Sequence, residues 1–459
     1  MNYKRTFLII ITAAALLFLI NYSGKAEFSL KNILDTAISK NNLSKTAVVS
    51  VSIRETESGE LIYEEKGNLL LHPASTLKAF TTPVMLEHLG IDSKIRTGLY
   101  RYKNNFYLKL SGDPLLTKED LVNLFKQVKN KGINSIENPL IIDDSVIDDI
   151  PWGIGWMWDD ENNPHMPKYN AYNLDNNLIK IKVAPGEKNI RPVVAVNPDF
   201  PVKIFNQATL SEKNDLTIER RPWQDPDIIY ITGEIASSVQ KTIPVGNPEK
   251  HFIHRLRQAI KENGIDFSGR VQKGEVPTEA VLLEEITHTV LEEVTNINQK
   301  SNNLAAETLF KHAGGEFSGS VGTTKDGVKA FKEFYTQLDA DPEKLFIVDG
   351  SGVSHNDLMY TNWMTLALSK LYNWKDFGSY LKTLAVPDAE NSLNGRFDDL
   401  SGKIWAKTGT LAGVSGLTGY LKTDSGKIYS FAILIQNYKG SSEKAKKLEN
   451  KIIKILANF

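Results

Sequence analysis

A serine and a lysine one helical turn apart are the first residues of this sequence that suggest chemistry. Ser75 and Lys78 follow Pro73 at the start of an apolar pattern with helical spacing, which ends at Gly90. Side chains three positions apart share one face of a helix, so the amine can approach the hydroxyl. Burial and neighbouring cations lower a lysine pKa enough for the amine to take the serine proton. The pair predicts a serine nucleophile, Ser75, with a lysine base, Lys78.

This spacing is not specific on its own. Chance would produce about one or two such pairs in a chain of 459 residues. The ordinary alternative for each pair is a serine that caps a helix, followed by a lysine in solvent. Three other pairs have the same spacing, namely Ser238/Lys241, Ser379/Lys382 and Ser441/Lys444.

A lysine, a threonine and a glycine follow one another at the end of a strand pattern near the C-terminus. Lys407-Thr408-Gly409 occurs once in the chain. The lysine supplies charge, the threonine supplies a hydroxyl, and the glycine lets a ligand approach the backbone closely. This combination predicts a strand that binds a substrate carboxylate, with a solvated strand end as the alternative.

A serine and an asparagine two positions apart are the third candidate element. We favour Ser301 and Asn303, because they immediately precede a helix rich in alanine and leucine. A short polar turn at this place can project both side chains into a cleft. The alternative is that they only cap the helix. The same spacing also occurs at Ser354/Asn356 and Ser392/Asn394.

The elements that position these motifs lie at the two ends of the chain. A helix and two strands are predicted near the N-terminus, and three strands joined partly by the turn 423–426 precede a last amphipathic helix. We expect these segments to complete one sheet. They are Phe28–Ile38, Ala47–Ile53, Leu61–Tyr63, Ile404–Lys407, Val414–Leu421, Ile428–Gln436 and Ser442–Leu456.

The region from about Ile91 to about Pro277 has a different texture, with short strand patterns between turns rich in Asp, Asn, Pro and Gly. We interpret it as an insertion. Its predicted strands are Phe106–Leu110, Asn177–Val183 and Ile228–Ile235, and Phe252–Asn263 is a predicted helix; two more helices, Asn302–Lys311 and Gly327–Asp339, follow it.

Length and composition limit the class of protein. A chain of 459 residues exceeds one ordinary core, so two or more domains are expected. The apolar fraction of 41% and charged fraction of 24% are typical of globular proteins. A net charge of −1 with interspersed signs excludes a nucleic-acid-binding stripe.

The N-terminus carries an export pattern. Lys4 and Arg5 precede an apolar run at 7–20, which is shorter than the roughly 20 residues of a membrane-spanning helix. Cleavage after Ala26 is expected, and an uncleaved anchor is the alternative, because Lys25 is an unhelpful neighbour for processing. The chain has no cysteine, so disulfides and lipid-modified cysteine are excluded.

The order of the three motifs along the chain resembles that of penicillin-binding proteins and serine beta-lactamases. The long gap before the second motif is similar to class C low-molecular-mass penicillin-binding proteins, which are D-alanyl-D-alanine carboxypeptidases and endopeptidases with domains inserted there. Further segments resemble that family: His72-Pro73-Ala74-Ser75-Thr76-Leu77-Lys78, Gly112-Asp113-Pro114, Asp349-Gly350-Ser351-Gly352-Val353-Ser354 and Asn391-Ser392-Leu393-Asn394-Gly395-Arg396.

The resemblance implies a multi-domain α/β fold. A beta-lactamase-like transpeptidase domain would have a central antiparallel sheet flanked by helices, with β-rich domains inserted into it. The corresponding limits are a signal peptide or anchor at 1–26, the transpeptidase-like domain at 27–90 and 281–459, and the insertion at 91–280.

It also implies roles for the motif residues. Ser75 attacks the D-Ala-D-Ala carbonyl, Lys78 takes its proton, Ser301 with Lys407 passes the proton to the leaving D-alanine, and Asn303 holds the amide on the acyl side. The middle residue of the second motif is asparagine where the family often has aspartate, which leaves these roles unaffected.

The end of the third motif and one residue of the insertion are the substrate-binding candidates. The resemblance implies that Thr408, Gly409 and Thr410 bind the terminal carboxylate, and that the backbone N–H groups of Ser75 and Thr410 form the oxyanion hole. Asp160 resembles an aspartate that recognises the D-centre of the peptide's diamino acid. A solvated loop acid is the alternative, and the adjacent Asp159 is as compatible with the match.

The predicted function is therefore a periplasmic, extracytoplasmic serine peptidase that acts on peptidoglycan peptides ending in D-Ala-D-Ala and is acylated by beta-lactams. No metal site and no cofactor is predicted: His251 and His254 are three residues apart, without a third ligand at suitable spacing. A beta-lactamase or esterase on the same framework and an inactive wall-binding scaffold are the alternatives.

Overall fold

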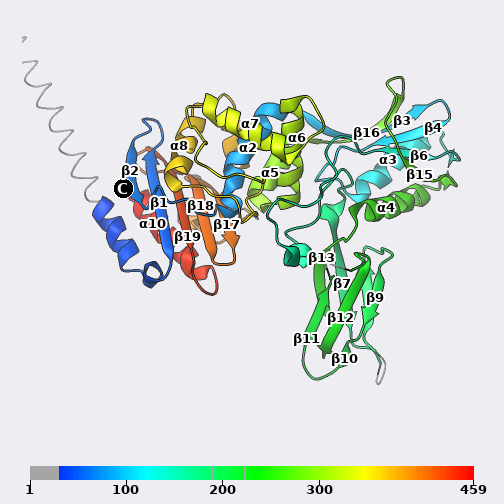
Figure 1. Cartoon of the computed structure of the whole chain (residues 1–459), viewed down its shortest axis with the longest axis horizontal. Coiled ribbons are helices and arrows are strands. Elements are labelled where there is room, and N and C mark those ends of the chain that lie inside the picture. The colour runs from blue at the N-terminus through cyan, green and yellow to red at the C-terminus, as the bar shows by residue number, and fades with distance from the viewer. Residues whose placement is uncertain (1–29, 188–190, 222–223, 388) are drawn as a thin grey trace, which may run out of the picture. The chain divides into compact units, whose positions relative to one another are not determined.

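The computed structural model describes residues 30–187, 191–221, 224–387 and 389–459 (Figure 1). The chain forms two compact units, which we describe separately. Of the described residues, those at 30–79, 335–346 and 357–459 belong to the first unit, and those at 80–334 and 347–356 belong to the second. The domain limits predicted at residues 90 and 280 stay predictions.

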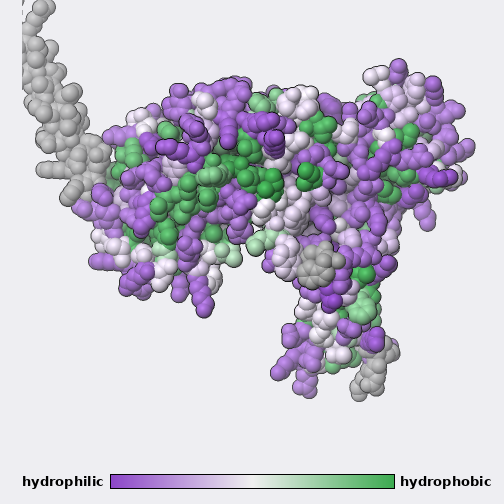
Figure 2. Space-filling view, viewed as in Figure 1, coloured by the Kyte–Doolittle hydropathy of each residue, from purple (hydrophilic) through white to green (hydrophobic). Residues whose placement is uncertain are grey.

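The predicted export signal lies outside the described residues. Within the described ranges, none of the helices combines the length and apolar character needed to cross a bilayer. Figure 2 shows mainly hydrophilic side chains on the visible face of each unit.

A five-stranded antiparallel sheet organises the first unit. Strands from both ends of the chain form it, because β1 pairs with β19 through eight residue pairs that begin at Val48 and Gln436. This pairing confirms the prediction that the terminal segments complete one sheet. The strands, in spatial order, are β17 (Ile404–Leu411), β18 (Val414–Lys422), β19 (Ile428–Gln436), β1 (Val48–Glu55) and β2 (Leu61–Glu65).

Helices cover both faces of this sheet. On β1, Val49 and Val51 belong to a core cluster that also contains residues of the helix at 30–39 and of α10 (Glu443–Ala457). The alternate residues face the other way, since Ser50 Oγ is 2.8 Å from Thr361 Oγ1 of α8 (Thr361–Leu371). The predicted central antiparallel sheet flanked by helices is confirmed. Smaller helical segments are η1 (Asn42–Lys45), η2 (Ala74–Leu77), α9 (Phe377–Thr383) and η5 (Asp398–Leu400).

The second unit contains a mixed five-stranded sheet with two amphipathic helices. The helix predicted at Phe252–Asn263 corresponds to α4 (Pro248–Glu262), whereas α3 (Lys118–Asn130) was not predicted from the sequence. A capping box between Thr117 and Asp120 starts α3. The strands, in spatial order, are β15 (Val271–Lys273), β6 (Leu140–Asp143), β4 (Asn105–Lys109), β3 (Lys94–Tyr102) and β16 (Val281–Thr289), and β5 (Ser135–Ile136) pairs with β14 (Asp266–Phe267).

Two smaller sheets in the second unit share one core of isoleucine and valine. Ile179 and Ile181 of one sheet and Ile229 and Ile231 of the other are all buried in it. This region accounts for the predicted β-rich insertion. Its strands are β13 (Val239–Pro244), β7 (Leu178–Ala184) and β8 (Val193–Asn197) in one sheet, and β10 (Thr209–Leu210), β12 (Ile228–Ile235), β11 (Asp215–Glu219) and β9 (Lys203–Asn206) in the other.

Four helices complete the second unit or begin at its limits. They are α2 (Lys78–Leu89), α5 (Val290–Lys300), α6 (Asn303–Ser318) and α7 (Thr324–Gln337). The first two residues of α2 and the last three residues of α7 belong to the first unit. The short 3₁₀ segments are η3 (Trp158–Asn162) and η4 (Asp175–Asn177).

Candidate active site

Ser75 and Lys78 lie in the first unit at the start of a helical segment. Ser75 belongs to the 3₁₀ turn η2, and Lys78 is the first residue of α2. The Nζ atom of Lys78 donates a hydrogen bond of 2.9 Å to Oγ of Ser75. Lys78 is fully buried, whereas Ser75 is partly exposed. All four Ser-x-x-Lys pairs lie within the described residues, and only this one is joined by a hydrogen bond.

The backbone just before the serine has an unusual conformation. Ala74 has a φ of +48°, which non-glycine residues rarely adopt. The amide of Ala74 donates a hydrogen bond of 3.0 Å to Nδ1 of His72, which supports this geometry. Strained backbone that a neighbouring group holds in place is common at active sites. No spacing rule connects His72 to Ser75, so the sequence did not indicate a role for this histidine.

Lys407 lies on β17 in the same unit and is also buried. Its Nζ atom donates a hydrogen bond of 2.9 Å to the carbonyl oxygen of Thr408. Burial, and secondarily the charge of Lys78, lowers the pKa of Lys407 well below the ordinary value of a lysine. Ser75, Lys78 and Lys407 thus come together within one unit from segments more than 300 residues apart.

Gly409 packs closely against the backbone of η2. The prediction that this glycine lets a ligand approach the strand stays a prediction, and the structure adds a packing reason for a glycine at this position. A Cβ atom at position 409 would be 3.0 Å from the carbonyl oxygen of Pro73 and 3.0 Å from the amide nitrogen of Thr76. The glycine therefore lets β17 approach the segment that carries Ser75. Of the adjacent threonines, Thr408 is half-buried and Thr410 is exposed.

Ser301 and Asn303 lie in the second unit, Ser301 in the turn after α5 and Asn303 as the first residue of α6. Ser301 has a left-handed φ of +59° at the end of α5. Asn302 caps α6, since its Oδ1 accepts a hydrogen bond of 3.1 Å from the amide of Ala305. Asn303 is buried and donates a hydrogen bond of 2.7 Å to the carbonyl oxygen of His165. The capping role that we considered as an alternative thus belongs to Asn302.

Asp160 lies in η3 of the second unit and is half-buried, whereas Asp159 is exposed. The Oδ2 atom of Asp160 accepts a hydrogen bond of 3.2 Å from the amide of Met157. Burial, helped by the charge of Asp159, raises the pKa of Asp160, although this hydrogen bond and the charge of His355 oppose the change. This hydrogen bond ties the carboxylate of Asp160 to the start of η3, and its recognition role stays a prediction.

Comparison with protein families provides the assignment. The sequence profile of the D-Ala-D-Ala carboxypeptidase 3 (S13) family matches residues 30–459. The chain belongs to this family. The predicted resemblance and enzyme class, a serine-type D-Ala-D-Ala carboxypeptidase, are therefore confirmed.

Named relatives cover most of the chain. D-alanyl-D-alanine carboxypeptidase DacB of Haemophilus influenzae is 23% identical over 439 residues, which is 90% of both chains. The D-alanyl-D-alanine carboxypeptidase of Actinomadura sp. strain R39 is 27% identical over 450 residues, or 91% of this chain and 83% of the relative. The crystal structure of penicillin binding protein 4 (dacB) from Haemophilus influenzae has a TM-score of 0.84 at 22% identity, covering 93% of this chain and 99% of that chain. That likeness confirms the predicted fold class.

A further segment of this S13-family chain has a structural explanation. Asp349 accepts hydrogen bonds from the backbone amides of Gly352 at 2.6 Å and Ser354 at 2.8 Å. Glu307 of α6 accepts another of 2.9 Å from the amide of Ser351. These carboxylates hold the backbone of the 349–354 segment in shape.

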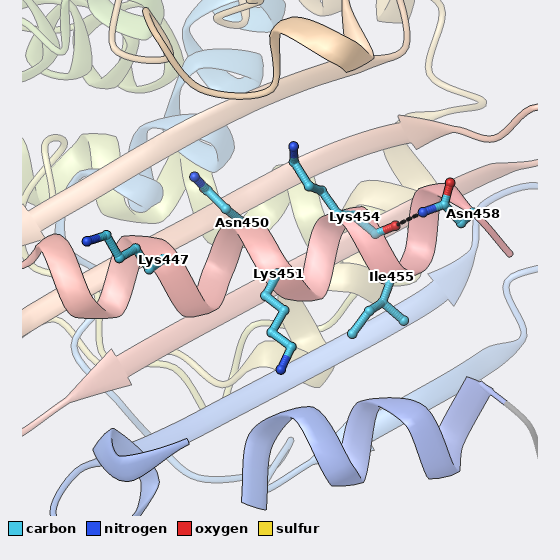
Figure 3. A pocket seen from close by; sticks show the side chains of 6 residues that line it. All are labelled: Lys447, Asn450, Lys451, Lys454, Ile455 and Asn458. Carbon is cyan, nitrogen blue, oxygen red and sulfur yellow. Dashed lines mark hydrogen bonds between the residues drawn. The ribbon is translucent and has the colours of Figure 1, made fainter. Parts of the chain in front are cut away.

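A hollow on the outer face of α10 is not a candidate active site. Figure 3 shows lysine side chains that spread away from the helix in different directions, and Nδ2 of Asn458 bonded to the carbonyl oxygen of Lys454. The hollow shares no residue with the motifs. Its lining residues are Lys447, Asn450, Lys451, Lys454, Ile455 and Asn458.

Proposed function

We propose that this chain cleaves the bond between the two terminal D-alanines of peptidoglycan stem peptides through an acyl-enzyme on Ser75. One observation carries the proposal: the buried amine of Lys78 lies 2.9 Å from the hydroxyl oxygen of Ser75 in a chain of the S13 family. A nucleophile and base within hydrogen-bond reach are the minimum that covalent catalysis needs. The lowered pKa of Lys407 indicates that this environment favours neutral amines.

The first half-reaction transfers the acyl group to the enzyme. Lys78 takes the proton of Ser75 as Oγ bonds to the carbonyl carbon, and the amide N–H groups of Ser75 and Thr410 stabilise the oxyanion. The C–N bond then breaks, and Ser301 with Lys407 delivers the proton to the departing amine of D-alanine. Asn303 holds the amide on the acyl side. The roles of Ser301 and Asn303 rest on the order of the motifs.

The second half-reaction releases the product. Water attacks the ester carbonyl, the bond to Oγ breaks, and Ser75 recovers its proton. Beta-lactams would trap the enzyme because their opened ring stays attached. A second structure of the Haemophilus protein is complexed with a beta-lactam, at a TM-score of 0.78 and 21% identity.

Substrate binding uses the carboxylate end and the diamino acid of the stem peptide. Thr408, Gly409 and Thr410 bind the terminal carboxylate beside Lys407, and Asp160 contacts the charged D-centre of the diamino acid. The role of Asp160 rests on the family resemblance of the segment that contains it. Cleavage of a cross-link uses the same chemistry, so we propose DD-endopeptidase activity as well. The N-terminal pattern supports an extracytoplasmic, periplasmic location.

The test is labelling of the full chain with a fluorescent penicillin, followed by peptide mass mapping and an assay of D-alanine release. We expect one stable adduct on Ser75, and neither adduct nor release from Ser75→Ala. Rapid loss of the adduct by hydrolysis would instead indicate a beta-lactamase. A folded chain with neither adduct nor release would contradict the proposal and indicate a scaffold.

A further inference from the structure

Three ionisable side chains of the second unit meet away from the peptidase motifs. Asp113, from the Gly112-Asp113-Pro114 segment, lies after β4; His288 lies at the end of β16, and Glu293 lies in the first turn of α5. Their ligand-type atoms, a ring nitrogen and two carboxylate oxygens, all lie within 4.8 Å of one another. The proposed reaction assigns no role to any of the three.

Asp113 and His288 already hold each other in position. Oδ2 of Asp113 is 2.7 Å from Nδ1 of His288. The other carboxylate oxygen of Asp113 accepts a hydrogen bond of 2.9 Å from the amide of Leu115, which fixes the orientation of the carboxylate. Metal ligands are commonly oriented by such outer hydrogen bonds.

Glu293 is the feature that needs an explanation. Its side chain is 0% exposed. Among the described residues, neither carboxylate oxygen of Glu293 makes a hydrogen bond of normal distance and angle, although Asp113 and the amide of Leu115 lie close enough to change its pKa. Burying a carboxylate without a partner is costly, and a second carboxylate beside it increases the cost. A cation shared by both groups removes this cost, because two carboxylates neutralise a divalent charge.

A surface pocket of about 250 Å³ leads to His288. Its charged lining residues are acidic, and no lysine or arginine is among them. Two of the acids, Glu284 and Glu285, form ion pairs with basic side chains that do not line the pocket, whereas Asp120 accepts a hydrogen bond from the hydroxyl of Thr117. An acidic entrance next to the imidazole is suitable for a cation. The lining consists of Asp120, Asn123, Leu124, Gln127, Glu284, Glu285, Ile286, Thr287 and His288.

We propose that Asp113, His288 and Glu293 form a binding site for one divalent transition-metal cation of the Zn²⁺ or Mn²⁺ kind. One imidazole nitrogen and two carboxylate oxygens are ligands that such cations accept, with water completing the coordination. Metal–ligand distances of about 2.0–2.2 Å require the Asp113 and His288 atoms to separate slightly and Glu293 to move inward. The cation would tie the first turn of α5, the helix that ends at Ser301, to the segment after β4 and to β16.

The first experiment measures binding to the full chain after treatment with a chelator. Calorimetric titrations with ZnCl₂, MnCl₂ and MgCl₂ should show one equivalent of Zn²⁺ bound more tightly than Mn²⁺, and Mg²⁺ weakest. The melting temperature should rise with Zn²⁺ concentration, since a ligand that binds only the folded state stabilises it. Absence of one-equivalent binding to the wild-type chain would overturn the proposal and leave a buried carboxyl pair that shares a proton.

Variants then locate the bound cation. Glu293→Gln and Asp113→Asn keep the side-chain shape and should weaken Zn²⁺ binding by about tenfold or more. Glu285→Gln is the matched control, because it removes one charge from the pocket lining without removing a proposed ligand, and it should bind Zn²⁺ nearly as the wild type does. Penicillin labelling of Ser75 verifies that each variant is folded. Equal Zn²⁺ affinity in Glu293→Gln and Glu285→Gln would place the cation elsewhere and refute the assignment.

Discussion

Gly409 on β17 lies against the 3₁₀ turn that carries Ser75, so close that a Cβ atom at position 409 would be 3.0 Å from the carbonyl oxygen of Pro73. The third motif and the nucleophile are therefore coupled through backbone packing in addition to side-chain chemistry. Any side chain at position 409 must push the turn and the strand apart.

We predict that Gly409→Ala impairs acylation of Ser75. Overpacking of this kind costs about 1–3 kcal/mol, and a misplacement of about 1 Å at the nucleophile can cost about 10²-fold in rate. The second-order rate of penicillin labelling measures the effect. Gly378→Ala on α9 is the control, because no neighbouring atom lies within 4 Å of its added Cβ. Equal labelling rates in the two variants would show that the contact at Gly409 is unimportant.

Removal of the Lys78 amine should slow acylation by about 10²–10⁴-fold, the usual contribution of a positioned base. Lys78→Met keeps an apolar side chain of similar length in the buried site and removes the hydrogen bond to Ser75. Lys382→Met makes the same substitution in another Ser-x-x-Lys pair, with Ser379 on α9. This variant should be labelled by penicillin at the wild-type rate. A Lys78→Met chain that acylates normally would exclude Lys78 as the base.

Local spacing explains why the sequence predicted part of the site correctly. Ser75 and Lys78 are three residues apart, so one helical turn brings them together whatever the rest of the chain does. The three C-terminal strands also follow from local alternation and from the turn that ends at Gly426, which has a φ of +85°. Such features need no knowledge of distant contacts.

The features that sequence analysis missed depend on distant contacts. Asp113 and His288 are 175 positions apart, and nothing in either segment indicates the other. The role of Gly409 likewise requires knowing that β17 packs on η2. By contrast, α3 was predictable, because Thr117 and Asp120 form a capping box ahead of an amphipathic pattern.

The lowered pKa of Lys407 predicts how stability depends on pH. Between this lowered pKa and the ordinary value of a lysine, the unfolded chain binds more protons at this position than the folded chain. The stability of the wild type should therefore rise with pH across that interval, relative to Lys407→Met, which lacks the titrating group. Melting temperatures of both chains, measured from neutral to alkaline pH, test this. A constant difference between them would mean that the pKa of Lys407 is the same in both states.

Substitution at Asp160 should affect recognition of the peptide and leave the chemistry of Ser75 unchanged. Asp160→Asn removes the charge proposed to contact the diamino acid, so KM for peptides with a charged D-centre should rise by roughly tenfold, about the value of one charge-assisted hydrogen bond. Penicillin labelling should not change. The pKa of Asp160 is raised, so this carboxylate takes up its proton at a higher pH than an ordinary aspartate does. On acidification, the KM of the wild type should therefore begin to rise at that higher pH.

Asp159→Asn is the matched control, since it removes the adjacent and exposed carboxylate. It should leave KM for the charged peptides nearly unchanged. Its own charge also raises the pKa of Asp160, so the acid rise in KM should move to lower pH in this variant. If Asp159→Asn raised KM and Asp160→Asn did not, the recognition role would belong to the exposed residue. If neither variant changed KM, the loop would be a solvated surface without a part in peptide binding.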